Sequence, residues 1–260
     1  MHIKPSVVAG IFYPQSQQAL HAAVSGYLTD ARIDAGAQPH ALIAPHAGYV
    51  YSGPIAASAY AAARPWRKQI RRVAVLAPSH RVAFQGIATS NADAFQTPLG
   101  DVPVDRAAIE TIESLPGVRL FDAAFVQEHA LEVQLPFLQG LLDDFELVPL
   151  IVGDADSDDV AGVIEALLRD DTLIIVSSDL SHYLDYPSAQ QRDRATTTHI
   201  EQLEPTRIGP QDACGAFPIR GLLQVARHHG WQVRTLDLRN SGDTAGDRSS
   251  VVGYGAYEFV

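Results

Sequence analysis

The sequence contains several short apolar runs, rich in Val, Ile and Leu, that alternate with segments of helical periodicity. Two of these runs are "RVAVLAP" and "TLIIVSS", and their nearly uninterrupted apolar character is typical of strands buried on both faces of a sheet. Because such strands need helices on both faces, the alternation predicts an α/β fold. We expect a central mixed, largely parallel sheet flanked by helices on both faces.

Six strands are expected from the apolar runs and the turn residues that interrupt them. Pro149 cannot donate a ladder hydrogen bond, so we expect its run to be an edge or bulged strand. The alternating residues of 231–238 suit an outer strand. The expected strands are 40–45, 72–78, 145–153, 172–178, 231–238 and 251–260.

Helical periodicity is clearest after Asp156 and Ser157, either of which can cap a helix. From Val160 to Leu168, apolar residues recur at the spacing of one helix face, which predicts a helix packed on the sheet. Further helices are expected at 16–28, 53–63, 103–114, 129–142 with a kink at Pro136, 188–203 and 213–229.

Length and charge narrow the class of protein. A chain of 260 residues, 47% of them hydrophobic, is expected to form one domain over 1–260. No apolar run approaches the roughly 20 residues of a membrane span, and the start lacks the layout of a signal peptide, so we expect a cytoplasmic protein. The net charge of −11 repels phosphate backbones and anionic lipids, which argues against nucleic-acid and membrane partners.

Polar residues end three of the expected central strands. "LIAPH" ends in His46, "VLAPSH" ends in His80, and "LIIVSSDLSH" leads to Asp179 and His182. Ligands of open α/β sheets gather beyond the carboxyl ends of the strands, so these side chains are expected to meet in one site. Each residue alone could instead cap a helix or form a hydrogen bond with a buried backbone group. Taken together, however, the residues favour a metal site.

Cys214 and the segment "QEHALE" supply further candidates. The only cysteine, Cys214, precedes an expected helix, whose amides would lower the pKa of its thiol and favour a metal-binding thiolate; a small buried side chain is the alternative. His129 and Glu132 lie three residues apart at an expected helix start, where both face one cleft or, alternatively, solvent. His228 and His229, at the end of the last expected helix, are interpreted as structural.

Seven segments together resemble one known family. They are "VVAGIFYP" (7–14), "LIAPHAGYVYSG" (42–53), "LAPSH" (76–80), "EHALEVQLPF" (128–137), "SSDLSHY" (177–183), "DACG" (212–215) and "SSVVGYGAYEF" (249–259). Their order over almost the whole chain is similar to that of the Memo family, also called AmmeMemoRadiSam system protein B. Arg81 stands where relatives often carry a second histidine.

The resemblance implies a fold similar to class III extradiol ring-cleaving dioxygenases, with a metal held by His46, His80 and Cys214. It also implies that His182, Asp179, His129 and Glu132 flank the same cleft as candidate catalytic residues. Iron is the metal we expect first, with copper or zinc as alternatives. An AMMECR-type domain protein and a radical SAM protein are the implied partners, beside an unknown small molecule or peptide in the cleft.

Three activities are open at this point. A thiolate ligand is itself oxidisable, which makes simple ring cleavage less favoured than another redox or oxygen-linked reaction on an unknown substrate. A cleft that only binds a peptide or a protein is the second hypothesis, and a hydrolase that uses a metal-bound hydroxide is the third.

Overall fold

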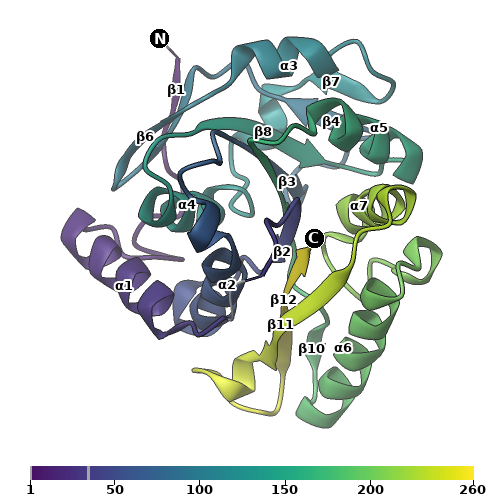
Figure 1. The fold of residues 1–260 in the computed structure, drawn as a ribbon. Helices are drawn as coiled ribbons and strands as arrows, with labels where there is room; N and C mark the ends of the chain where they lie inside the picture. Colours follow the sequence, from purple (N-terminus) through teal and green to yellow (C-terminus); the bar gives the residue numbers. More distant parts are fainter. Residues whose placement is uncertain (1, 34–35) are drawn as a thin grey trace.

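The computed structural model describes residues 2–33 and 36–260, and these form an α/β fold around a nine-stranded mixed sheet (Figure 1). The strand order is β10-β12-β2-β9-β3-β8-β4-β7, and β11 pairs with β12. The strands are β1 Ile3–Lys4, β2 Ala41–Ala44, β3 Arg72–Pro78, β4 Ile87–Thr89, β5 Ala94–Thr97, β6 Gly100–Pro103, β7 Val118–Leu120, β8 Glu146–Val152, β9 Thr172–Ser177, β10 His182–Leu184, β11 Val233–Asn240 and β12 Val251–Phe259.

The centre of the sheet is parallel. Strands β2, β9, β3 and β8 run in the same direction, and their apolar residues are buried on both faces, as the uninterrupted apolar runs predict. Antiparallel pairs flank this centre, with β12 beside β2 and β4 beside β8. The mixed sheet is therefore confirmed, and its centre is parallel.

Helices cover both faces of this sheet. Figure 1 shows α1, α2 and α4 on one side and α5, α6 and α7 on the other. No helix in the described ranges has the length and apolar character needed to cross a bilayer. The α-helices are α1 Gln17–Asp30, α2 Tyr49–Ala63, α3 Arg106–Ile112, α4 Leu135–Leu141, α5 Ser157–Leu167, α6 Tyr186–Glu201 and α7 Ala216–His229, and short 3₁₀ turns include η3 Glu132–Gln134.

Two expectations about individual elements are wrong. The segment 129–142 is not one kinked helix, because His129 lies in a loop and α4 begins only at Leu135, with Pro136 in its first turn. Strand β8 is not at an edge: it pairs with β3 along its whole length, but with β4 only at Ile151 and Val152. Pro149 is tolerated inside the sheet because β4 does not reach it.

The sequence patterns also miss several short strands. A separate three-stranded sheet joins β1, β5 and β6, and the strands β4, β7 and β10 extend the large sheet. These strands have only two to four residues, and such short pairings leave little periodicity to detect.

Candidate metal centre

Three neighbouring strands deliver the polar residues of the site to one edge of the sheet. Strand β9 lies between β2 and β3, in parallel register with both, so that Ala44 is paired with Ser177. His46 follows the end of β2, and His80 follows the end of β3. Asp179 follows β9 and lies between the two histidines in the order of the strands. The sheet therefore brings the three predicted strand ends together.

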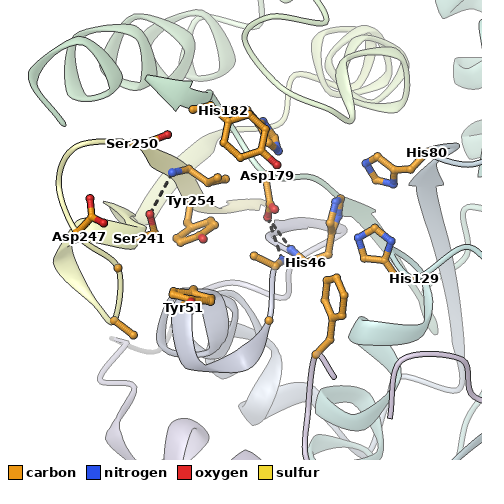
Figure 2. A pocket seen from close by; sticks show the side chains of 17 residues that line it. His46, Tyr51, His80, His129, Asp179, His182, Ser241, Asp247, Ser250 and Tyr254 are labelled. Atoms are coloured by element: carbon orange, nitrogen blue, oxygen red, sulfur yellow. Dashed lines mark hydrogen bonds between the residues drawn. The ribbon is translucent and has the colours of Figure 1, made fainter. Parts of the chain in front are cut away.

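His46, His80 and His129 form a compact cluster of imidazole rings, seen at the right of Figure 2. The ring centroids are 5.2 Å apart for His46 and His80, 5.5 Å for His46 and His129, and 4.9 Å for His80 and His129. One ring nitrogen from each residue lies within 4.8 Å of those of the other two. The three rings line a cavity of about 770 Å³.

The hydrogen bonds of His46 indicate which of its nitrogens can bind an ion. Its Nδ1 lies 2.8 Å from the Ser177 hydroxyl oxygen, and that hydroxyl donates its only hydrogen to the Ala130 carbonyl at 2.7 Å. Ser177 must then accept a hydrogen bond from His46 Nδ1, as it does from the Gln134 side-chain amide at 2.7 Å. The lone pair of His46 is consequently on Nε2.

Burial keeps this imidazole neutral. His46 is only 2% exposed, and burial, followed by the charges of His80 and His129, holds the pKa of His46 well below its usual range. A neutral imidazole is the form that binds metal, because the protonated ring offers no lone pair.

Glu128 anchors the other two rings of the cluster. Its carboxylate accepts a hydrogen bond from the His80 backbone amide at 2.6 Å and lies 2.9 Å from His80 Nδ1. Burial alone would raise the pKa of Glu128, but the nearby rings of His129 and His80 and the Ala130 amide lower it strongly overall. The carboxylate thus stays charged, and it binds His80 through Nδ1, which leaves Nε2 as the nitrogen able to hold an ion.

Asp179 fixes the backbone of the first strand end. Its Oδ1 accepts hydrogen bonds from the amides of His46 at 2.8 Å and Ala47 at 3.3 Å (Figure 2). Burial raises the pKa of Asp179 in spite of these hydrogen bonds. Asp179 lines the cavity, as expected, and it also holds the loop that carries His46.

Cys214 lies beside His46 but outside the cluster of three rings. Its Sγ is 3.4 Å from His46 Nε2 and accepts a hydrogen bond from the Asp179 amide at 3.2 Å. It lines a second cavity of about 460 Å³ together with His80 and His182. Among the described residues, the group of mutually close donors contains His129 and not Cys214.

The expected lowering of the thiol pKa is wrong for this structure. Burial, and then the charge of Asp179, raise the pKa of the Cys214 thiol. The cysteine precedes Gly215, the residue before α7, but desolvation outweighs the amides that the helix start provides. In this state the thiol keeps its proton.

His182 lines both cavities. Its Nδ1 lies 2.8 Å from the Leu180 carbonyl, which can only accept, so Nδ1 carries the hydrogen and Nε2 carries the lone pair. Tyr183, the next residue, has a left-handed backbone with φ of 59° and is 77% exposed. Such strained backbone is often found beside binding sites.

Glu132 does not face the cavity, which corrects the expectation that it flanks the cleft with His129. Its buried carboxylate accepts hydrogen bonds from the amides of Val7 at 2.7 Å and Val8 at 3.0 Å and from the Tyr13 hydroxyl at 2.6 Å. The reason is the 3₁₀ turn at 132–134, which replaces the expected helix. Glu132 therefore anchors the N-terminal segment.

Sequence patterns missed several residues that complete the site. Phe12 comes from that N-terminal segment and packs on His129, with ring centroids 4.6 Å apart. The sequence offered a signal for Glu128, which directly precedes His129. Phe12 and the aromatic residues of the cavity lie within segments that resemble the family, but no pattern indicated that their side chains line a cavity. Tyr183 also lines the cavity. Further lining residues are Tyr51, Tyr254, Ser241, Asp247 and Ser250 (Figure 2).

The donors fit a metal ion of borderline character. His46 and His80 each use Nδ1 for a hydrogen bond and keep Nε2, the arrangement typical of metal-binding histidines. His129 Nδ1 is buried 3.3 Å from Glu128, without a well-aligned hydrogen bond to any described residue. Three imidazoles suit zinc, copper, iron or nickel, and the adjoining cavity leaves room for a further ligand.

Comparison with known proteins agrees with these motifs. The family described as Memo-like protein matches residues 4–258. A MEMO1 family protein of Aeropyrum pernix is 35% identical, over 98% of this chain and 99% of its own length. MEMO1 family proteins of Aquifex aeolicus and Thermotoga maritima are each 32% identical, over 98% of both chains. With this likeness along its whole length, the chain belongs to the Memo family.

Proposed function

We propose that the chain binds one divalent or redox-active metal ion per molecule and uses it in a redox or oxygen-linked reaction on a small molecule. The observation that carries this proposal is the cluster of His46, His80 and His129, whose donor nitrogens lie within 4.8 Å of one another beside a 770 Å³ cavity. Iron remains our first choice of metal, with copper or zinc as alternatives.

His46 and His80 hold the ion through Nε2, because their Nδ1 atoms are bound by Ser177 and Glu128. Two residues compete for the third position. His129 has the better geometry, while Cys214, 3.4 Å from His46 Nε2, would have to give up its proton to bind. We retain both arrangements, since each makes a distinct prediction for a single substitution.

When bound, the ion would activate a ligand by withdrawing charge from it. His182 supplies the base. It lines the cavity, and its Nδ1 is bound by the Leu180 carbonyl, which leaves Nε2 free to accept a proton. Asp179 positions the His46 backbone and, with His182, forms the polar part of the wall. Tyr51, Tyr183 and Tyr254 form an aromatic wall that suits a planar substrate.

Metal analysis of protein purified without added metal tests the proposal. We expect about one ion per chain, its loss in His46→Ala and His80→Ala, and retention in His21→Ala, an exposed histidine on α1. Loss in His129→Ala with retention in Cys214→Ala identifies the third ligand as His129, and the reverse pattern identifies Cys214. Metal content that is unchanged in both His46→Ala and His80→Ala contradicts the proposal.

A second candidate function is a binding module on an enzyme-like fold. It is favoured by the large exposed side chains at the cavity mouth, of which Tyr183 is 77% and Tyr51 is 39% exposed. Oxygen uptake with catechols and thiols separates the two functions, because a metal-loaded but inert protein favours binding. Oxygen uptake with catechols but not with thiols would indicate ring cleavage of the class III extradiol type.

The setting of this activity is also a proposal. We infer that the chain works in the cytoplasm with an AMMECR-type domain protein and a radical SAM protein, as its family membership suggests. Co-purification of tagged chain with these two proteins from its own cells tests this inference, and absence of both from the eluate contradicts it.

A further inference from the structure

Helices α5 and α7 lie side by side and run in the same direction (Figure 1). In the first turn of α5, Asp158 accepts a hydrogen bond at 3.1 Å from the side-chain amide of Gln224, which lies in the second half of α7. At the ends of both helices, His229 contacts Glu165. The close approach needs Gly221, because a Cβ there would lie 2.3 Å from a Val160 methyl carbon. The packed pair therefore brings two helix C-terminal ends together.

Three metal-binding side chains meet at these ends. Glu165 from α5 and His228 and His229 from α7 each offer one donor atom, and all of these atoms lie within 4.8 Å of one another. His229 Nε2 is 3.0 Å and 2.9 Å from the two carboxylate oxygens of Glu165. None of the three residues lines the cavity of the histidine cluster.

The surroundings favour a cation. The C-terminal end of a helix carries a partial negative charge, and here two such ends adjoin a carboxylate. The position of His229 is also restricted, because its ring stacks on Trp231 with centroids 5.4 Å apart, and Trp231 in turn stacks on His40 at 4.7 Å. His229 and Glu165 are 39% and 38% exposed, so an ion can reach them from solvent.

We propose that Glu165, His228 and His229 form a second metal site, which takes a borderline divalent cation of the zinc type. The site is separate from the histidine cluster and does not depend on the function proposed for it. Two imidazoles and one carboxylate are donors that zinc accepts, and the fourth position is left to water. A purely structural role at the negative end of α7 explains the position of His228 and His229. It does not explain why the Glu165 carboxylate of α5 faces them.

The distances are close to those of a bound ion. Zinc binds imidazole nitrogen and carboxylate oxygen at about 2.0–2.2 Å, so two donors on one tetrahedral ion lie roughly 3.3 Å apart. His229 Nε2 and Glu165 are already within a few tenths of an ångström of that separation. His228 is exposed and can rotate to close the remaining gap.

Equilibrium dialysis against zinc tests the site, with four forms of the full chain. We expect wild type and His21→Ala to bind one more zinc ion per chain than His228→Ala and Glu165→Gln do. His21 is an exposed helical histidine outside both clusters, and it controls for unspecific binding to imidazole. All of the substituted side chains are at the surface, so the variants should fold.

Thermal unfolding supplies a second measurement. Zinc should raise the unfolding midpoint of wild type more than that of Glu165→Gln, because only the former gains an ion that joins α5 to α7. His80→Ala should lose binding at the histidine cluster and keep this additional ion, which separates the two sites. Equal zinc binding by wild type, His228→Ala and Glu165→Gln would overturn the proposal.

Discussion

Glu128 binds His80 at two points: its carboxylate accepts from the backbone amide at 2.6 Å and lies 2.9 Å from the ring Nδ1. The same buried carboxylate lies 3.3 Å from His129 Nδ1. One acidic residue thus orients two of the three rings in the candidate metal centre and supplies a negative charge that offsets that of a cation.

This relationship predicts the effect of Glu128→Gln. The amide keeps the shape of the side chain but loses the charge and one acceptor, so we expect metal affinity to fall about 10- to 100-fold. A competition titration with a chromogenic chelator measures the change. Glu110→Gln, on the exposed face of α3, is the control and should bind as wild type does. Unchanged affinity in Glu128→Gln would show that the carboxylate does not support the ion.

Ser177→Ala should weaken both folding and metal binding. The hydroxyl accepts from His46 and Gln134 and donates to the Ala130 carbonyl, so its removal leaves buried polar groups without their partner. We expect the free energy of unfolding to fall by about 1–3 kcal/mol, as measured by urea denaturation. In Thr198→Ala, which removes an exposed hydroxyl on α6, the change should be within about 0.5 kcal/mol. Similar losses in both variants would contradict the network described for Ser177.

The N-terminal segment should depend on Glu132. Glu132→Gln removes a charged acceptor from two backbone amides and the Tyr13 hydroxyl, and we expect a loss of about 2–3 kcal/mol in the free energy of unfolding. Tyr13→Phe removes one of these donors and should cost about 1 kcal/mol. Limited proteolysis should cut the first residues faster in Glu132→Gln. Resistance equal to that of wild type would mean that the segment is held by other contacts.

Asp193 should make stability depend on pH. Burial raises the pKa of this carboxyl above 3.8, although the Ser181 amide donates to it at 3.0 Å. A raised folded-state pKa gives stability that is complete below the unfolded value and is lost as the pH rises through the folded value. Relative to Asp193→Asn, wild type should therefore lose free energy of unfolding as the pH rises from about 4. Parallel pH profiles of the two proteins would rule out this assignment.

The central part of the site was predictable because it depends on local patterns. The apolar runs identify β2, β3 and β9, and a parallel sheet must bring their carboxyl ends to one edge, which places His46, His80 and Asp179 close together. The same reasoning could not predict the position of His129, because this residue lies in a loop whose place depends on tertiary packing. Cys214 was a candidate ligand from its place before a helix and from the family resemblance, and this assignment stays a prediction.

Other features depend on contacts between distant parts of the chain. The direction of Glu132 is set by backbone amides some 120 residues earlier, which no spacing rule within "EHALE" reveals. The raised pKa of Cys214 follows from desolvation, which a sequence does not display. The pairing of Glu165 with His229 requires the packing of α5 on α7, so that two unremarkable surface residues become neighbours only in the folded chain.

The pairing of Ala44 with Ser177 in the parallel centre of the sheet also affects which parts of the molecule unfold locally. Because β2, β9 and β3 are buried on both faces, their amide hydrogens should exchange with solvent among the slowest in the chain. Local unfolding of the surface loops would leave these central strands folded. The candidate ligands His46 and His80, which follow two of the strands, therefore stay in place when the loops around the cavity move.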